Sequence, residues 1–223
     1  MGCRGSKVPE KIVLYYDKRS APCRTVLLTA ASLNIKVELK EINIQKGEHM
    51  TPEFLKINPQ HCIPTMQDGD FTLWESRAIA QYLVNQYASN DSLYPREPKR
   101  RALVDARLNF DQGCLYQRLL NFYFKLFSEK VKDDELIKKF LEAIELLNTF
   151  LEGKLWAAGD TMTIADFALA ASVSTAECFD FVDLDKYPHV NKWLARCKGN
   201  MKGYEEANQD GINALKETIA NFK

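Results

Sequence analysis

The chain has 223 residues, and its 30 lysine and arginine side chains are balanced by 30 aspartate and glutamate side chains. A net charge of zero argues against nucleic acid as a partner, because polyanions attract proteins with excess positive charge. Hydrophobic residues make up 46% of the chain and charged residues 27%, which excludes a disordered or fibrous protein. The length allows one large domain or two smaller ones.

The six cysteines lie far apart, at positions 3, 23, 62, 114, 178 and 197. No pair has the spacing of a zinc site, and the polar start of the chain does not have the pattern of a secretory signal. No apolar run reaches the ~20 residues that a membrane-spanning helix needs. We therefore expect free thiols, no metal site and a cytoplasmic protein.

Residues 11–87 alternate short β-prone runs with runs of helical spacing. Strands are expected over 12–16, 37–42, 63–66 and 71–73, and helices over 22–33, 52–57 and 75–87. The last two strands flank Asp68-Gly69-Asp70, a turn signature typical of a hairpin. This order, a βαβ unit followed by a ββα unit, predicts a four-stranded α/β domain.

Residues 88–98 contain two prolines and no periodicity, which predicts a linker. Helical spacing then continues over 99–129, 134–151, 164–178, 190–198 and 203–222. Asp166 follows Thr163 by three residues and indicates half of a capping box at a buried helix. We therefore expect an all-helical second domain over 99–223.

The loop after the first predicted strand places Ser20 at the start of a helix, just before Ala21-Pro22-Cys23. Free backbone N–H groups and the positive end of the helix dipole meet at such a start, and the dipole alone stabilises a bound thiolate by about 0.5 to 2 kcal/mol. A hydroxyl at Ser20 can add a hydrogen bond. Serine is also a common N-cap residue, so the loop alone leaves capping and catalysis as equal alternatives.

Other polar or special residues fall in the remaining loops of this domain. Ile63-Pro64 stands before a strand and is either a cis peptide or an ordinary strand-initiating proline. Glu75-Ser76-Arg77 opens a helix with donors for a carboxylate and an acceptor for an ammonium, although glutamate is also ordinary in a first turn. His49 and His61 lie in two more loops. All of these residues, together with Ser20, fall in strand-end loops of one domain, and this shared position favours a ligand site.

Long motifs in a fixed order carry a resemblance to a known family. They are Leu14-Tyr15-Tyr16 with Ser20-Ala21-Pro22-Cys23-Arg24, residues 47–54, residues 58–65, residues 73–79, and Thr161-Met162-Thr163-Ile164-Ala165-Asp166. Over residues 11–223 the chain resembles the cytosolic glutathione transferases, and its sequence motifs are similar to those of the insect delta class. The resemblance implies a thioredoxin-like domain over 11–87, a helical domain, and a homodimer.

The resemblance also implies conjugation of reduced glutathione, as co-substrate, to small hydrophobic electrophiles in detoxification. In that pattern Ser20 donates a hydrogen bond to the glutathione sulfur and is not itself a nucleophile. The remaining assignments place His49 and His61 at the glycine end, the Ile63 backbone at the cysteinyl amide, and Glu75, Ser76 and Arg77 at the γ-glutamyl end.

The loop before Ser20 departs from the delta pattern, which usually has Pro-Gly where this chain has Lys18-Arg19 after Asp17. Tyr16 occupies the place of the tyrosine that other branches of the family use, so it is the reserve assignment. The altered loop also leaves open a non-catalytic binding or structural protein of this type. A thiol oxidoreductase using Cys23 is disfavoured, because Ser20 is not a cysteine and Cys23 is expected to be buried.

An aromatic stripe in the second domain is the candidate electrophile site. Tyr116, Leu119, Tyr123, Phe124 and Phe127 recur on one helix face, and such a stripe is more often core than pocket. The resemblance reverses that preference and implies a pocket formed by Tyr116, Tyr123, Phe124 and Phe127, with Ala21 and Pro22 facing them.

Residues 1–10 extend beyond the usual start of the family. Met1-Gly2-Cys3-Arg4-Gly5-Ser6 matches the pattern for N-myristoylation, and Cys3 offers a second acylation site. A plain unstructured tail is the favoured alternative. A membrane is expected as a partner only if this terminus is acylated.

Overall fold

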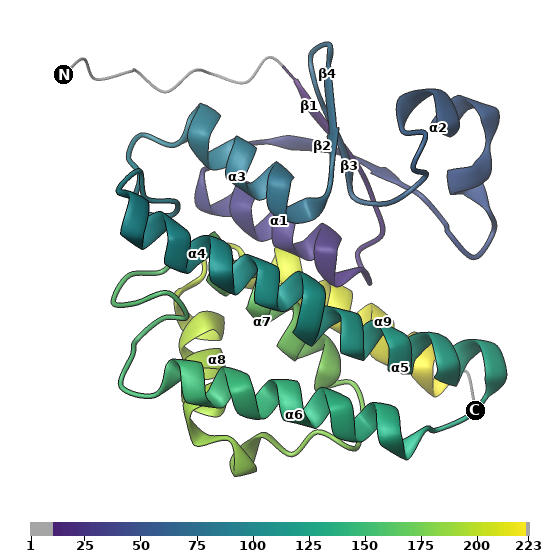
Figure 1. Ribbon diagram of the computed structural model, residues 1–223. Helices are drawn as coiled ribbons and strands as arrows, with labels where there is room; N and C mark the ends of the chain where they lie inside the picture. Colours follow the sequence, from purple (N-terminus) through teal and green to yellow (C-terminus); the bar gives the residue numbers. More distant parts are fainter. Residues whose placement is uncertain (1–10, 222–223) are drawn as a thin grey trace.

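The computed structural model describes residues 11–221. The extension over residues 1–10, with its acylation motif, lies outside the described residues. The described chain forms a sheet-containing half and a helical half, which lie one above the other in Figure 1. The predicted fold class, α/β followed by all-α, is confirmed.

The sheet has four strands in the order β2-β1-β3-β4. Their bounds are β1 Ile12–Tyr16, β2 Val37–Glu41, β3 Thr65–Asp68 and β4 Phe71–Trp74. β1 pairs in parallel with β2 and antiparallel with β3, which forms the predicted hairpin with β4. β3 begins two residues later than expected, since Pro64 has no N–H to donate to the ladder. The Ile63–Pro64 peptide is cis, one of the two alternatives above.

Three helices accompany the sheet: α1 Ala21–Ser32, α2 Pro52–Ile57 and α3 Ser76–Tyr87, with a single 3-10 turn, η1 Glu48–Met50, before α2. In Figure 1, α1 and α3 lie between the sheet and the helical half, while α2 lies to one side. The side chains of Leu14, Met66 and Ile79 meet in the core under the sheet. Thr51 caps α2 as predicted, accepting a hydrogen bond from Phe54 N at 3.3 Å.

The helical half is built around one buried helix, α7 Ile164–Ala176, all of whose residues are buried. The other elements are α4 Pro98–Phe110, η2 Asp111–Leu115, α5 Tyr116–Glu129, α6 Asp134–Leu151, η3 Leu184–Lys186, α8 Pro188–Asn200, η4 Glu205–Gln209 and α9 Asp210–Ala220. Asp166 forms the predicted capping box with Thr163 and also accepts a hydrogen bond from Trp193 Nε1. Among residues 11–221, no helix is both long and apolar enough to cross a bilayer.

Two of the expected helices contain a turn of π-helix. The run predicted over 99–129 is interrupted by η2, and the run predicted over 203–222 begins with η4 before α9. Hydrophobic periodicity does not distinguish one such turn from the surrounding α-helix, because the apolar residues on either side remain near their helical spacing. The turn at η2 has a consequence for the candidate site, because it contains Asp111.

Candidate active site

Ser20 occupies the N-cap position of α1, yet its side chain makes no capping hydrogen bond. Its backbone is fixed on both sides, with Ser20 N donating to Asp17 O at 3.0 Å and Arg24 N donating to Ser20 O at 3.1 Å. The hydroxyl is therefore not used to cap the helix. It stands beside the free N–H groups of the first turn, where an anion is stabilised.

The loop that departs from the delta pattern is held by an internal fork. Arg19 donates to Asp17 from Nε at 3.0 Å and from NH2 at 2.6 Å, and its backbone N–H donates to the same carboxylate at 2.8 Å. Asp17 is buried. A charge-assisted fork of this kind is directional, so it fixes the conformation of the loop over residues 17–19.

Two residues near Ser20 were considered as alternatives, and their surroundings bear differently on those roles. Cys23 is completely buried, and burial raises the pKa of its thiol to about 12. Such a thiol stays protonated at neutral pH and is a poor nucleophile. Tyr16 lines a cavity of about 410 Å³ between β1, α1 and α9, and burial raises the pKa of its phenol. Burial therefore argues against Cys23 as a nucleophile, while Tyr16 keeps its proton and remains the reserve hydroxyl donor.

The two loop histidines are brought together, with their ring centroids 6.0 Å apart. His49 Nδ1 is buried and has no hydrogen-bond partner. His61 is exposed and has a positive φ of 46°, and it precedes the cis peptide by two residues. An unsatisfied buried nitrogen at such a place is what a ligand group would satisfy.

Glu75 is presented to solvent at the start of α3 in a left-handed conformation, with φ of 71°. Its two carboxylate oxygens accept from Gln60 Nε2 at 3.1 Å and from Gln112 Nε2 at 3.3 Å. Gln60 is in turn held by Trp74 Nε1 at 2.8 Å. The carboxylate is therefore oriented by both halves of the molecule and keeps acceptor capacity for an ammonium group.

Ser76 and Arg77 lie behind Glu75 and are buried. Arg77 NH1 donates to Ser76 Oγ at 2.8 Å, and NH2 forms a buried ion pair with Asp111 of η2. The guanidinium also lies 5.4 Å from the ring centroid of Tyr116. NH1 and NH2 of Arg77 are thus bonded within the protein, whereas its buried Nε has no hydrogen-bond partner, and Ser76 joins Arg77 to the candidate site.

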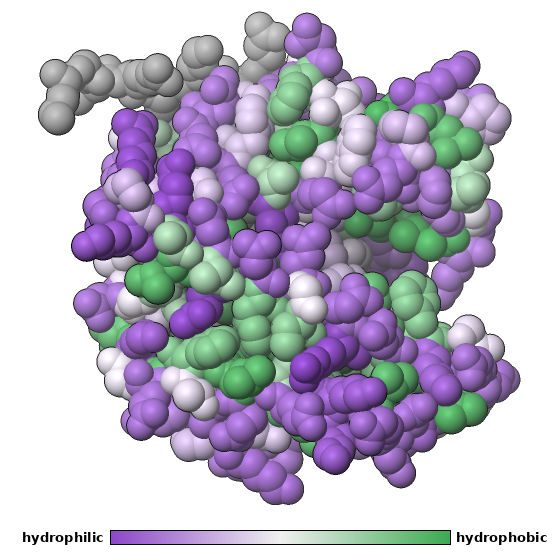
Figure 2. Space-filling view, viewed as in Figure 1, coloured by the Kyte–Doolittle hydropathy of each residue, from purple (hydrophilic) through white to green (hydrophobic). Residues whose placement is uncertain are grey.

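The aromatic stripe divides into core and accessible residues. Leu119 is buried, whereas Tyr116, Tyr123 and Phe127 are half-buried and Phe124 is 60% exposed. The rings of Tyr123 and Phe127 stack at 4.3 Å. Figure 2 shows a recess where the two halves meet on the side of α2 and α5, with hydrophobic residues on its walls. The expected Ala21 and Pro22 are buried in the first turn of α1.

Several residues that shape this site have no strong signal in the sequence. Gln60, Gln112 and Asp111 orient Glu75 and Arg77, and the Asp17–Arg19 fork orients the loop of Ser20. A buried arginine such as Arg77 needs an acidic partner, but the helical pattern gives no reason to choose Asp111 over the other acids nearby in the sequence. Within residues 11–221, no three potential metal-ligating side chains gather at one point.

Both halves of the chain match models of a known protein family, and solved structures match nearly the whole chain. A model described as the glutathione S-transferase N-terminal domain matches residues 12–85, and one described as the C-terminal domain matches residues 111–199. A delta-class glutathione transferase of Nilaparvata lugens is 43% identical, covering 95% of this chain and 100% of its own, with a TM-score of 0.92.

Two further solved structures extend the likeness. A glutathione transferase of Bombyx mori is 45% identical over 95% of this chain and 99% of its own, with a TM-score of 0.91. A glutathione transferase homologue of Drosophila mojavensis, solved with bound glutathione, is 34% identical over 95% of this chain and 97% of its own, with a TM-score of 0.89. Each likeness spans both halves of the described chain.

Proposed function

The chain belongs to the glutathione S-transferase family, and from this membership we propose that the Ser20 hydroxyl stabilises the glutathione thiolate during conjugation. The protein is a glutathione transferase, an enzyme that binds glutathione and conjugates it. The observation that carries the serine assignment is a hydroxyl at the start of α1 that makes no capping bond.

The proposed mechanism follows from the position of that hydroxyl. A free thiol has a pKa of about 8.5 and is mostly protonated at neutral pH, and each unit of depression corresponds to about 1.36 kcal/mol. A hydrogen bond from Ser20 and the N-terminus of α1 together account for about one to two units. The thiolate then attacks a carbon of the electrophile; the C–S bond forms as the leaving group departs with the bonding electron pair.

We assign the rest of glutathione to the other loops of residues 11–87. In our proposal Ile63 binds the cysteinyl amide through its backbone, and His49 and His61 bind the glycine carboxylate. Glu75 accepts from the α-ammonium group, and Ser76 donates to the α-carboxylate. We assign Arg77 an indirect role, because its guanidinium is already bound to Ser76 and Asp111.

The electrophile is proposed to bind in the recess between the halves. Tyr116, Tyr123, Phe124 and Phe127 would supply one apolar wall and Ala21 and Pro22 the other, which suits small hydrophobic electrophiles and a role in detoxification. This proposal divides the chain into a glutathione-binding domain over 11–87, a linker over 88–98 and an electrophile-binding domain over 99–223.

We further propose a cytoplasmic homodimer. The cysteines at 23, 62, 114, 178 and 197 are free thiols, which suits a reducing compartment. Phe71 on the edge strand β4 and Leu103 on α4 are 43% and 51% exposed, and large apolar side chains of this kind favour contact with a second copy. Light scattering of the purified enzyme tests the dimer.

The serine assignment is tested with Ser20→Ala and a chlorodinitrobenzene as electrophile. We expect kcat to fall by about tenfold for each pKa unit lost from the bound thiol, with the KM for glutathione little changed. Ser32→Ala, at the opposite end of α1, is the matched control and should retain full activity. Unchanged kcat in Ser20→Ala would refute the assignment, and loss of activity in Tyr16→Phe would transfer it to Tyr16.

A further inference from the structure

Gly211, in the first turn of α9, is packed directly beneath the loop that carries Ser20. The residue is buried. A methyl carbon on its Cα would lie 2.1 Å from the carbonyl oxygen of Lys18 and 2.6 Å from Cδ of Arg24. Both distances are far below van der Waals contact. The Lys18 oxygen belongs to the backbone, so it cannot move unless the loop moves with it.

The glycine at this position is not required by its own backbone. Gly211 is helical, and it is not among the glycines with a positive φ. Glycine inside a helix costs about 1 kcal/mol relative to alanine, so a helical position without strain ordinarily favours a side chain. The close approach of the Lys18 carbonyl supplies the reason for glycine here.

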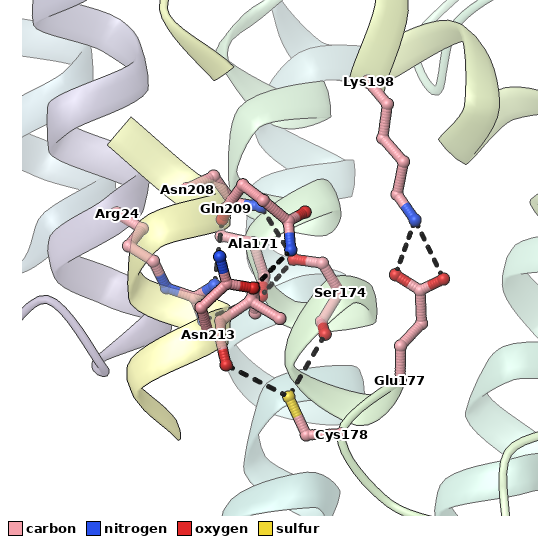
Figure 3. A network of polar contacts seen from close by, with 10 residues as sticks. Arg24, Ala171, Ser174, Glu177, Cys178, Lys198, Asn208, Gln209 and Asn213 are labelled. Carbon is pink, nitrogen blue, oxygen red and sulfur yellow. Dashed lines mark hydrogen bonds and ion pairs between the residues drawn. The ribbon is translucent and has the colours of Figure 1, made fainter. Parts of the chain in front are cut away.

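Arg24 fixes the same region from the side of α1. Its side chain is fully buried, and NH1 donates to Asn208 Oδ1 at 3.0 Å. NH2 donates to Ala171 O at 3.3 Å and to Thr175 Oγ1. Figure 3 shows Arg24 beside α7 and the segment of Asn208 and Asn213. The first turn of α1 is thereby joined to two segments of the helical half.

The acceptors around this guanidinium are all neutral. Among residues 11–221 no carboxylate is paired with Arg24, its Nε has no hydrogen-bond partner, and burial lowers its pKa to about 10. A buried cation without a counter-charge is costly to the folded state. Stability alone therefore gives a poor reason for arginine here, whereas a hydrogen-bonding fork that spans two segments gives a good one.

We propose that Gly211 and Arg24 are positioning residues for Ser20. Gly211 leaves the space in which the Lys18 carbonyl rests, and Arg24 fixes the first turn of α1 on α7 and on η4. The loop cannot shift without moving Ser20, whose N–H and C=O are both bonded within it and α1. The inference rests on the proposed role of Ser20, since a small displacement matters only if the hydroxyl must meet the sulfur.

The principal test is Gly211→Ala, with Gly199→Ala as the matched control. Gly199 also lies in a helix, α8, but a methyl carbon there meets nothing within 4 Å. In Gly211→Ala we expect about a tenfold fall in kcat and in the bound thiolate seen by ultraviolet absorbance, equivalent to about one pKa unit. The KM for glutathione should stay near that of the parent, because Glu75 and Ser76 are not displaced. Gly199→Ala should match the parent throughout.

A second readout uses the protein without glutathione. Displacement of the loop should accelerate hydrogen exchange at the amides of Arg19 and Ser20 in Gly211→Ala, and a peptide from α6 serves as the internal reference. Unchanged exchange together with unchanged thiolate absorbance would overturn the inference. The inference would also be overturned if Gly211→Ala kept the parental kcat and thiolate absorbance while Ser20→Ala lost its thiolate absorbance. Unchanged thiolate absorbance in Ser20→Ala would instead refute the proposed function.

Arg24→Lys keeps the charge but cannot bridge the same acceptors. If Gly211→Ala does not fold, this variant tests whether these contacts position Ser20. We expect a smaller loss of kcat and of thiolate absorbance than in Gly211→Ala, again with little change in the KM for glutathione. Thermal unfolding identifies a folded variant. A folded Arg24→Lys with parental thiolate absorbance and parental kcat would contradict the role of Arg24.

Discussion

The proposed glutathione end and the proposed electrophile end of the candidate site are held in different ways. At the glutathione end, Glu75 is bound by two glutamine amides, and Arg77 by Ser76 and Asp111. At the electrophile end, the rings of Tyr123 and Phe127 stack on each other, and Phe124 is mostly exposed. Directional hydrogen bonds fix an orientation, while stacked rings tolerate rearrangement. In the proposed function, this difference suits an enzyme that binds one constant substrate and several variable ones.

The largest effect on this contrast is expected from breaking the buried ion pair. Asp111→Ala would leave the guanidinium of Arg77 buried without its counter-charge, at a cost of about 3–5 kcal/mol in the free energy of unfolding. Urea unfolding monitored by circular dichroism measures the loss. Lys186→Ala removes an exposed ion pair with Asp183 and should leave the midpoint unchanged. Equal midpoints for the two variants would mean that the pair does not stabilise the glutathione end.

An intermediate effect is expected on stability at alkaline pH, and it comes from the thiol of Cys23 in the first turn of α1. The pKa of Cys23 is raised from 9.0 to about 12 by burial, so its thiol ionises first in the unfolded chain as the pH rises. The stability it contributes is therefore present below about pH 9 and lost between about pH 9 and 12. In Cys23→Ala the free energy of unfolding should fall less steeply with pH between about pH 9 and 12 than in the parent. The variant should keep full transferase activity. Lost activity would revive Cys23 as a catalytic group.

The smallest effect is expected at the exposed ring of the electrophile end. Phe124→Ala removes a side chain with little burial, so the unfolding midpoint should change little. The ratio of kcat/KM values between a bulky and a small electrophile should shift about fivefold, since an apolar contact contributes about 1–3 kcal/mol and a ring that is mostly exposed lies at the lower end of that range. The KM for glutathione serves as the control. A change confined to that KM would show that the two ends are not independent.

Prediction from sequence succeeded where short patterns have one physical meaning. The order of strands and helices along residues 11–87 followed from β-prone runs, helical spacing and the hairpin turn. Thr51 and Thr163 were recognisable caps because their neighbours complete the motif. Long motifs placed Ser20 and Glu75 in loops of one domain. These features depend on residues close together in the chain, so the sequence contains the information needed to find them.

The remainder depends on contacts between distant segments. The partner of Arg77 lies in a π-turn that periodicity does not reveal, and the Asp17–Arg19 fork holds its loop by side-chain bonds that no pattern announces. Gly211 has no local feature that separates it from Gly199; only the approach of the Lys18 carbonyl does so. Tertiary packing assigns such roles, and a linear pattern cannot.

The complete burial of α7 has a consequence for the order in which the enzyme is made. Residues 11–87 leave the ribosome first, but α1 packs on α7, and α7 begins only at Ile164. During synthesis the face of α1 that α7 will cover therefore stays open to water until residues 164–176 have emerged. An exposed apolar face during that interval is a target for aggregation or for a chaperone. Final docking of the two halves is thus timed by the arrival of a single helix.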